Sequence, residues 1–127
     1  MLQKVDAVTV PVPDLDTGIG FYAGHLGHHL VWRNDAVGQA ALSLPGADTE
    51  IVLTTRQGYE PTWLVDDVPT AVEDFRRGGG AVLSEPRNVP VGRVAVVEDP
   101  FGNALVLLDL SKGRYTTGSD GRVTGVA

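Results

Sequence analysis

The chain has no cysteine among its 127 residues, which excludes disulfides and metal sites built on thiolates. It also lacks the run of about 18 apolar residues that a membrane span needs, and it lacks a basic start followed by an apolar targeting segment. Basic residues are few: 10 Lys and Arg against 16 Asp and Glu give a net charge of −6. Nucleic-acid binding favours a basic face. These absences predict a soluble cytoplasmic protein with no nucleic-acid and no membrane partner.

The composition that remains is that of a globular protein. Hydrophobic residues make up 43% of the chain and charged residues 20%, enough apolar surface for a real core. The length suits one domain, residues 1–127. The acidic balance leaves room for a cationic small ligand, although many acidic proteins are acidic only for solubility.

One stretch combines a polar turn with an apolar strand. Residues 99–103 read Asp-Pro-Phe-Gly-Asn, in which Pro100 suits a tight turn and Gly102 and Asn103 tolerate positive φ. Residues 104–110 follow as a short apolar run. This pattern predicts a reversal of the chain into a buried strand.

The first half of the chain has the pattern of one helix among four strands. Alternation predicts a strand over residues 4–12, and Asp14 or Asp16 is suited to cap a helix whose apolar stripe ends before Gly27. Three more strands are expected at residues 28–33, 39–44 and 49–55.

The second half repeats this order. A strand is predicted over residues 61–65, followed by a helix that Asp67 caps and that residues 78–80 end. The remaining expectations are a short strand at 81–83, a loop at 84–89, strands at 92–98 and 104–110, and a tail or late edge strand at 111–127.

The two halves align at a constant shift of 53 positions. The matching pairs are Asp14 and Asp67, Thr17 and Thr70, Gly27 and Gly80, and Leu30 and Leu83. A shared shift of cap, helix and stop indicates duplication of one βαβββ unit. We therefore expect module one at residues 4–56 and module two at 60–110.

With this repeat in view, the chain resembles the glyoxalase, bleomycin-resistance and extradiol-dioxygenase superfamily, also called the vicinal oxygen chelate fold. The resemblance covers residues 4–110 and rests on five phrases, at residues 12–15, 21–22, 26–27, 65–68 and 99–103. It implies an α+β fold in which two tandem βαβββ modules form a curved mixed sheet around a cavity.

The resemblance also implies where a metal ion would bind in metal-dependent members. The four ligand positions correspond to Ala7, a position near Glu50, Glu60 and Val106. Ala7 and Val106 have no donor atom, and two carboxylates without imidazole make a poor transition-metal site. We therefore predict no metal and no cofactor, and the sequence gives no catalytic residue.

The residues expected to contact a ligand are Thr9, Trp32, Arg33, Glu50, Glu60 and Thr62. Each has a plainer alternative. The two glutamates are either pocket acids or solvated charges at strand ends. Trp32 either stacks on a planar ligand or packs as a partly buried aromatic, and Arg33 either reaches the cavity rim or is solvated.

Two functions from different classes remain open. The first is a metal-free protein that binds a small molecule, such as a cationic aromatic or antibiotic-like compound, as the bleomycin-resistance branch does. The second is a metal-dependent lyase, isomerase or dioxygenase that uses Glu50 and Glu60. A homodimer is expected, because both faces of the last strand are apolar and need cover.

Overall fold

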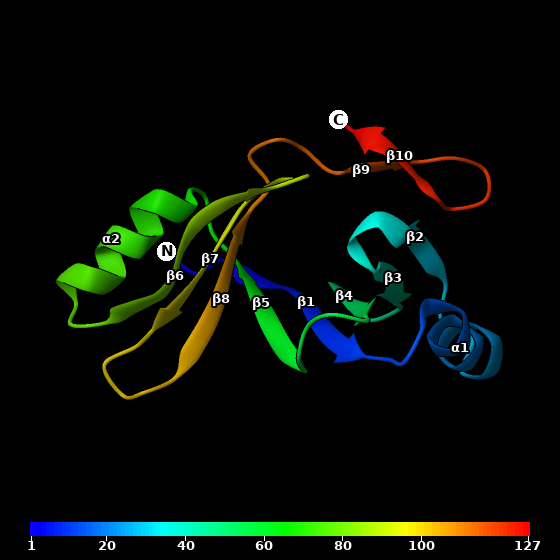
Figure 1. Ribbon diagram of the computed structural model, residues 1–127, viewed down its shortest axis with the longest axis horizontal. Coiled ribbons are helices and arrows are strands. Elements are labelled where there is room, and N and C mark those ends of the chain that lie inside the picture. Colours follow the sequence, from blue (N-terminus) through cyan, green and yellow to red (C-terminus); the bar gives the residue numbers. More distant parts are fainter. The chain divides into compact units, whose positions relative to one another are not determined.

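The computed structural model describes residues 1–127 and divides into two compact units. The first unit contains Asp6–Glu60 and Tyr115–Gly125, and the second contains Pro61–Arg114 with the short segments Met1–Val5 and Val126–Ala127. Each unit holds one βαβββ module, shown as the blue-to-bluish-green and the green-to-orange parts of Figure 1. The predicted α+β fold of two tandem modules is confirmed.

The first unit folds four strands against one short helix. Strand β1 lies parallel to β4, and β3 lies antiparallel to both β2 and β4, in the order β2-β3-β4-β1. Its elements are β1 (Lys4–Pro11), α1 (Leu15–Ile19), the π-helix η1 (Gly20–His25), β2 (Leu30–Asn34), the 3-10 turn η2 (Asp35–Val37), β3 (Gln39–Leu44) and β4 (Ala47–Thr54).

The second unit repeats this topology. Strand β5 lies parallel to β8, and β7 lies antiparallel to both β8 and β6, in the order β5-β8-β7-β6. Its elements are β5 (Glu60–Leu64), α2 (Val68–Arg77), β6 (Ala81–Val89), β7 (Gly92–Glu98) and β8 (Ala104–Asp109).

Each helix begins at the aspartate that the sequence predicted. The Asp14 carboxylate accepts hydrogen bonds from Thr17 N at 2.7 Å and Thr17 Oγ1 at 2.9 Å. Asp67 accepts the same pair of bonds from Thr70, at 3.0 Å and 2.6 Å. These bonds satisfy amide groups that a helix start leaves unpaired, and they lower the pKa of both aspartates.

One face of each sheet packs on its helix. In the first unit the buried core contains Leu15, Ala40, Leu42 and Leu53. In the second unit it contains Val65, Val68, Ala71, Val72, Ala95, Val97 and Leu107. Burial of these apolar side chains is the main force that holds each helix on its sheet.

The shift between the modules does not stay at 53 beyond the helices. Gly27 adopts φ 83°, but its counterpart with positive φ is Gly79, at φ 91°, and not Gly80. Likewise Val82 packs on the second core as Leu30 packs on the first, whereas Leu83 is 53% exposed. The π-helix η1 explains the difference, because a π-helix accommodates one residue more than regular α-helix over the same length.

The prediction of a loop at residues 84–89 is wrong, because strand β6 continues through this segment. Strand β6 pairs with β7 as far as Val89, with register shifts on both sides of Ser84. It is an edge strand, and Pro86 lies within the second irregularity, where it interrupts no regular ladder bond. Polar residues and a proline are typical of an edge strand that is protected from further pairing. The same composition is also typical of a loop, which is why the sequence predicted one here.

The turn at residues 99–103 is built around one carboxylate. Asp99 accepts hydrogen bonds from Phe101 N at 2.8 Å, from Asn103 N at 2.9 Å and from Asn103 Nδ2 at 2.8 Å. The bonds from Asn103 are the main cause that lowers the pKa of Asp99. Gly102 supplies the positive φ of 90° that the reversal requires. This motif therefore shapes the entry into β8.

The segment predicted as a tail or late edge strand forms a hairpin. Strands β9 (Tyr115–Thr117) and β10 (Val123–Val126) make a separate two-stranded sheet. Its turn closes with bonds from Gly118 N to Arg122 O and from Gly121 N to Gly118 O.

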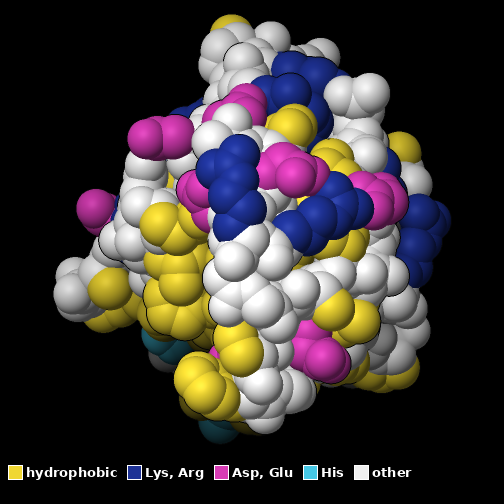
Figure 2. All heavy atoms as spheres, turned by 90° about the vertical axis from the view of Figure 1, so that its left-hand side faces the viewer, with side chains coloured by type: hydrophobic (Ala, Val, Ile, Leu, Met, Phe, Trp, Pro, Cys, Tyr) yellow, Lys and Arg dark blue, Asp and Glu magenta, His cyan; other side chains and the backbone are white.

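The surface near α2 carries paired charges. Figure 2 shows basic and acidic side chains side by side on this face of the molecule. The ion pairs of the helix include Arg76 with Glu85 and Arg77 with Asp74, all of them solvent-exposed, so each adds little to stability. No helix of the protein has the length and apolar character needed to cross a membrane.

Candidate functional site

A bulge in β2 decides where Trp32 and Arg33 lie. Leu30 pairs with Leu42, but the register shifts before Trp32, which pairs with Ala41, while Arg33 pairs with Ala40. Ala40 belongs to the core under α1, and Ala41 belongs to a separate cluster on the opposite face of the sheet. Arg33 therefore lies on the helix side of the sheet and Trp32 on the other side.

The face that carries Trp32 has a floor of small apolar side chains. Ala7, Ala41 and Val52 are buried there, and Trp32 packs against them. Glu50 shares this face, because it alternates with Val52 along β4 and pairs with Ala7 across the sheet. We call the set the Trp32 face, and its members are Ala7, Thr9, Trp32, Ala41, Glu50 and Val52.

Thr9 is the polar residue at the centre of the strand next to β4. Its hydroxyl Oγ1 lies 2.6 Å from Gly58 O and 3.1 Å from Glu60 O, and only 4% of the residue is exposed. A hydroxyl has one proton to donate, so the two carbonyls share it. Thr9 therefore fastens the link between the modules to β1.

The two glutamates are both half-buried, and both lie in the segment Asp6–Glu60 of the first unit. Glu50 is on β4, opposite Ala7. Glu60 is the first residue of β5, and its carbonyl oxygen is held by Thr9. The backbone position of Glu60 is thus set by a buried contact, and that of Glu50 by the ladder between β1 and β4.

Thr62 belongs to the second unit. It pairs with Val106 in the parallel ladder of β5 and β8 and is half-buried. Its neighbour Trp63 packs on the core under α2, so Thr62 points to the other face of that sheet. Thr9 and its partner Val52 form the equivalent pair in the first unit.

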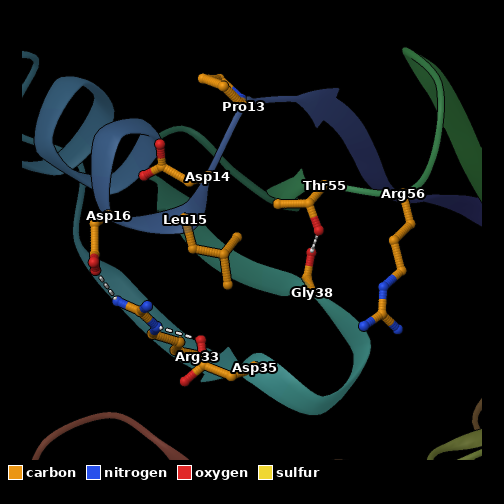
Figure 3. A pocket seen from close by; sticks show the side chains of 9 residues that line it. All are labelled: Pro13, Asp14, Leu15, Asp16, Arg33, Asp35, Gly38, Thr55 and Arg56. Carbon is orange, nitrogen blue, oxygen red and sulfur yellow. Dashed lines mark hydrogen bonds and ion pairs between the residues drawn. The ribbon is translucent and has the colours of Figure 1, made fainter.

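Arg33 lies in a shallow pocket beside the start of α1, where it forms two ion pairs. It donates to Asp16 Oδ1 at 2.7 Å and to Asp35 Oδ1 at 2.9 Å (Figure 3). These carboxylates, Asp16 first, raise the pKa of the guanidinium. Its side chain is 18% exposed. Arg33 therefore links the first turn of α1 to β2.

The rest of this pocket is lined by charged side chains and tight turns. Arg56 donates to Ala36 O at 3.1 Å, and Gly38 leaves no space for a Cβ atom, which would lie 2.4 Å from Thr55 Oγ1. The lining residues are Pro13, Asp14, Leu15, Asp16, Arg33, Asp35, Gly38, Thr55 and Arg56. In this pocket the charge of Arg33 is already balanced by Asp16 and Asp35.

The side chains present do not fit the metal site of metal-dependent relatives. Ala7 and Val106 are apolar and only 5% and 9% exposed, so neither can donate to a metal ion. Within either unit, no group of three or more His, Cys, Asp or Glu side chains is placed to hold one.

Sequence reasoning gave Tyr115 no place in the fold. In the structure its ring lies 4.7 Å from that of Trp32, centroid to centroid, at an interplanar angle of 57°. Its hydroxyl accepts a hydrogen bond from Asn34 Nδ2 at 3.3 Å. The residues are far apart in the chain and no periodic pattern connects them, so no local signal could have revealed this contact.

Tandem βαβββ modules with this strand order define a class of protein, and comparison with known proteins identifies it. The family described as Glyoxalase/Bleomycin resistance protein/Dioxygenase superfamily matches residues 4–107. The chain belongs to this superfamily. A comparison with curated protein sequences gave no match.

Solved structures show the same fold. Methylmalonyl-CoA epimerase from Mycobacterium tuberculosis is 25% identical, with a TM-score of 0.67 over 85% of this chain and 88% of that one. A Streptomyces coelicolor methylmalonyl-CoA epimerase variant in complex with 2-nitronate-propionyl-CoA is 23% identical, with a TM-score of 0.65 over 86% and 98%. Hypothetical protein BH1468 from Bacillus halodurans is 16% identical, with a TM-score of 0.68 over 91% and 98%.

Proposed function

We propose that this protein binds a small cationic aromatic molecule without a metal ion, at the Trp32 face. The observation that carries the proposal is the placement of Trp32 and Glu50 on one face of a sheet whose floor is Ala7, Ala41 and Val52. An indole attracts cations and planar rings. A half-buried carboxylate favours a cationic partner over a neutral one.

The superfamily supports the proposal of a metal-free binding protein. Its description includes bleomycin resistance proteins. A binding protein needs no metal ligands, which agrees with the apolar residues Ala7 and Val106 at two of the four positions where metal-dependent members hold a metal ion. Thr9 and Glu60 contribute by holding the link between the modules against β1.

The test compares two probes of the same shape. Benzyltrimethylammonium is cationic and neopentylbenzene is its neutral isostere, so their difference in affinity isolates charge. We expect the cation to bind more tightly to the parent protein. Glu50→Gln should reduce that preference by about tenfold, the effect of removing one close opposite charge, and isothermal titration measures both affinities.

Matched variants separate the two glutamates from the general acidity of the surface. Glu60→Gln tests the second candidate acid in the same way. Asp48→Asn is the control, because Asp48 is an exposed carboxylate on the same strand as Glu50. If the cation and its neutral isostere bind equally well to the parent protein, the proposal is wrong.

A second candidate function is epimerase activity, and one observation favours it: the 25% identity to methylmalonyl-CoA epimerase over most of both chains. The test is incubation with methylmalonyl-CoA and a divalent metal in D₂O. Deuterium incorporation by the parent protein that is lost in Glu50→Gln or Glu60→Gln would favour the enzyme. No incorporation would exclude epimerase activity on this substrate.

A further inference from the structure

The C-terminal hairpin lies beyond residues 4–107, the part of the chain that matches the superfamily. It contacts β2 of the first unit, the strand that carries Trp32. Three kinds of contact join them: one between aromatic rings, one between backbone groups and one between charges.

The aromatic contact places Tyr115 against the indole. The ring centroids are 4.7 Å apart, and Asn34 Nδ2 donates to the Tyr115 hydroxyl at 3.3 Å. The tyrosine is thus held at its ring by Trp32 and at its hydroxyl by the last residue of β2. Both side chains are half-buried, so part of the indole remains accessible.

The backbone contact fixes the turn of the hairpin on the edge of the sheet. Arg33 N donates to Gly121 O at 3.0 Å, and Arg33 and Arg122 form an isolated parallel bridge. Gly121 adopts φ 81°, a conformation that suits glycine. Strand β2 is the outer strand of the first unit's sheet, and the hairpin covers its free edge.

The charged contact joins Arg122 to Asp35. Arg122 Nη1 donates to Asp35 Oδ2, and the side chains are 55% and 51% exposed. Asp35 also accepts from Arg33, so one carboxylate connects the hairpin to the pocket beside α1. Because both partners are solvated, salt weakens this contact.

We propose that the hairpin is a strap that fixes Trp32 on the Trp32 face, with Tyr115 as a positioning residue for ligand binding. This inference rests on the proposed function. An indole at a sheet edge has several rotamers, and a ring already held in one of them loses less freedom when a ligand stacks on it. The hairpin therefore raises the affinity of the Trp32 face for its ligand by holding Trp32 in place, and it does not have to contact the ligand itself.

The test measures the accessibility of Trp32 and the affinity for the ligand in two separate experiments. The chain has two tryptophans, so Trp63→Phe leaves Trp32 as the only indole fluorophore. In this background we compare Tyr115→Ala, Tyr115→Phe and the control Tyr59→Ala, which removes a tyrosine that is 76% exposed. Acrylamide quenching without ligand measures access to Trp32, and titration with benzyltrimethylammonium measures affinity.

We expect Tyr115→Ala to increase the quenching constant about twofold and to weaken binding about two- to tenfold, the range of an aromatic pair. Tyr115→Phe should restore most of both values, because the ring contact with Trp32 remains and only the hydrogen bond from Asn34 is lost, and Tyr59→Ala should change neither. If Tyr115→Ala does not fold, Arg122→Gln loosens the strap at its charged contact and should shift both readouts in the same direction by less.

The outcomes distinguish the strap from the proposed function. Unchanged quenching in Tyr115→Ala overturns the strap. Increased quenching with unchanged affinity overturns the positioning role of Tyr115. Increased quenching in Tyr115→Ala, in a protein whose parent form binds neither the cation nor its neutral isostere, supports the strap and overturns the proposed function.

Discussion

Asp109, at the end of β8, accepts a hydrogen bond from Val68 N, the first residue of α2, at 2.8 Å. Its other oxygen accepts from Arg93 N at 3.0 Å, and its side chain is fully buried. Burial raises the pKa of Asp109, but the hydrogen bonds from Val68, Ser111 and Arg93 more than offset this and leave the pKa lowered. One buried carboxylate thus joins a helix start to two strands of the second unit.

The first prediction removes this carboxylate. Asp109→Ala leaves the buried amide groups of Val68 and Arg93 without their acceptor, and we expect it to lower the free energy of unfolding by about 2–4 kcal/mol. Urea unfolding at pH 7 measures the change. Asp74→Ala, which removes an exposed carboxylate from α2, should change it by less than about 0.5 kcal/mol. Equal effects of the two substitutions would contradict the central role of Asp109.

The second prediction concerns two glycines. A Cβ atom at Gly92 would lie 2.0 Å from the Asp109 carbonyl oxygen, which no local adjustment of a flexible side chain can relieve. Gly92→Ala should therefore destabilise the protein by about 2 kcal/mol or more. Gly20 has helical backbone angles and no atom near the position of a Cβ, so Gly20→Ala should stabilise it by about 0.5–1 kcal/mol. Thermal unfolding of both variants checks the contrast.

The third prediction concerns pH. The pKa values of Asp14, Asp67, Asp99 and Asp109 are all lowered in the folded state. A carboxylate with a lowered folded pKa contributes stability above its unfolded value, about 3.9, and loses it as the pH falls through the folded value.

Stability from these groups should therefore be constant above about pH 5 and fall steadily below about pH 4. The urea midpoint measured from pH 2 to pH 8 tests this. Asp67→Asn should flatten the acidic part of the curve, and a midpoint that rises on acidification would contradict the assignment.

The fourth prediction concerns metal ions. Because Ala7 and Val106 supply no donor, purified protein should hold well under one equivalent of any divalent metal. Nickel, zinc, manganese and iron should barely shift its melting temperature, since a ligand stabilises a protein only as far as it prefers the folded state. Elemental analysis after dialysis and differential scanning fluorimetry measure both. A stoichiometric metal that survives dialysis would instead favour the metal-dependent enzyme.

The fifth prediction is that the protein forms a homodimer. Strand β8 is apolar on both faces: Leu107 packs on the core under α2, and Leu108, which points to the other face, is only half-buried. A two-fold interface would bury the apolar surface that remains on each copy. Light scattering after size exclusion should report about twice 13.4 kDa, and a monomer at high micromolar concentration would refute the prediction.

The sequence alone determined the duplication, both helix starts and most strands. Asp14 and Asp67 each bond to a threonine three residues later, so their signals are local and survive in any fold that contains the helix. The alternation of residues in β1 and the short apolar run of β8 are also local signals, because each follows from how that strand is buried. These features predicted two βαβββ modules and therefore the superfamily.

Only the tertiary structure decided the changes in register and the contacts between distant segments. The extra residue of η1 is not visible in composition, because a π-helix differs from an α-helix in hydrogen bonding and not in residue type. Strand β6 forms from a polar segment because β7 supplies its backbone partners. The contact between Trp32 and Tyr115 depends on where the hairpin packs, and long-range packing of this kind leaves no periodic pattern in the sequence.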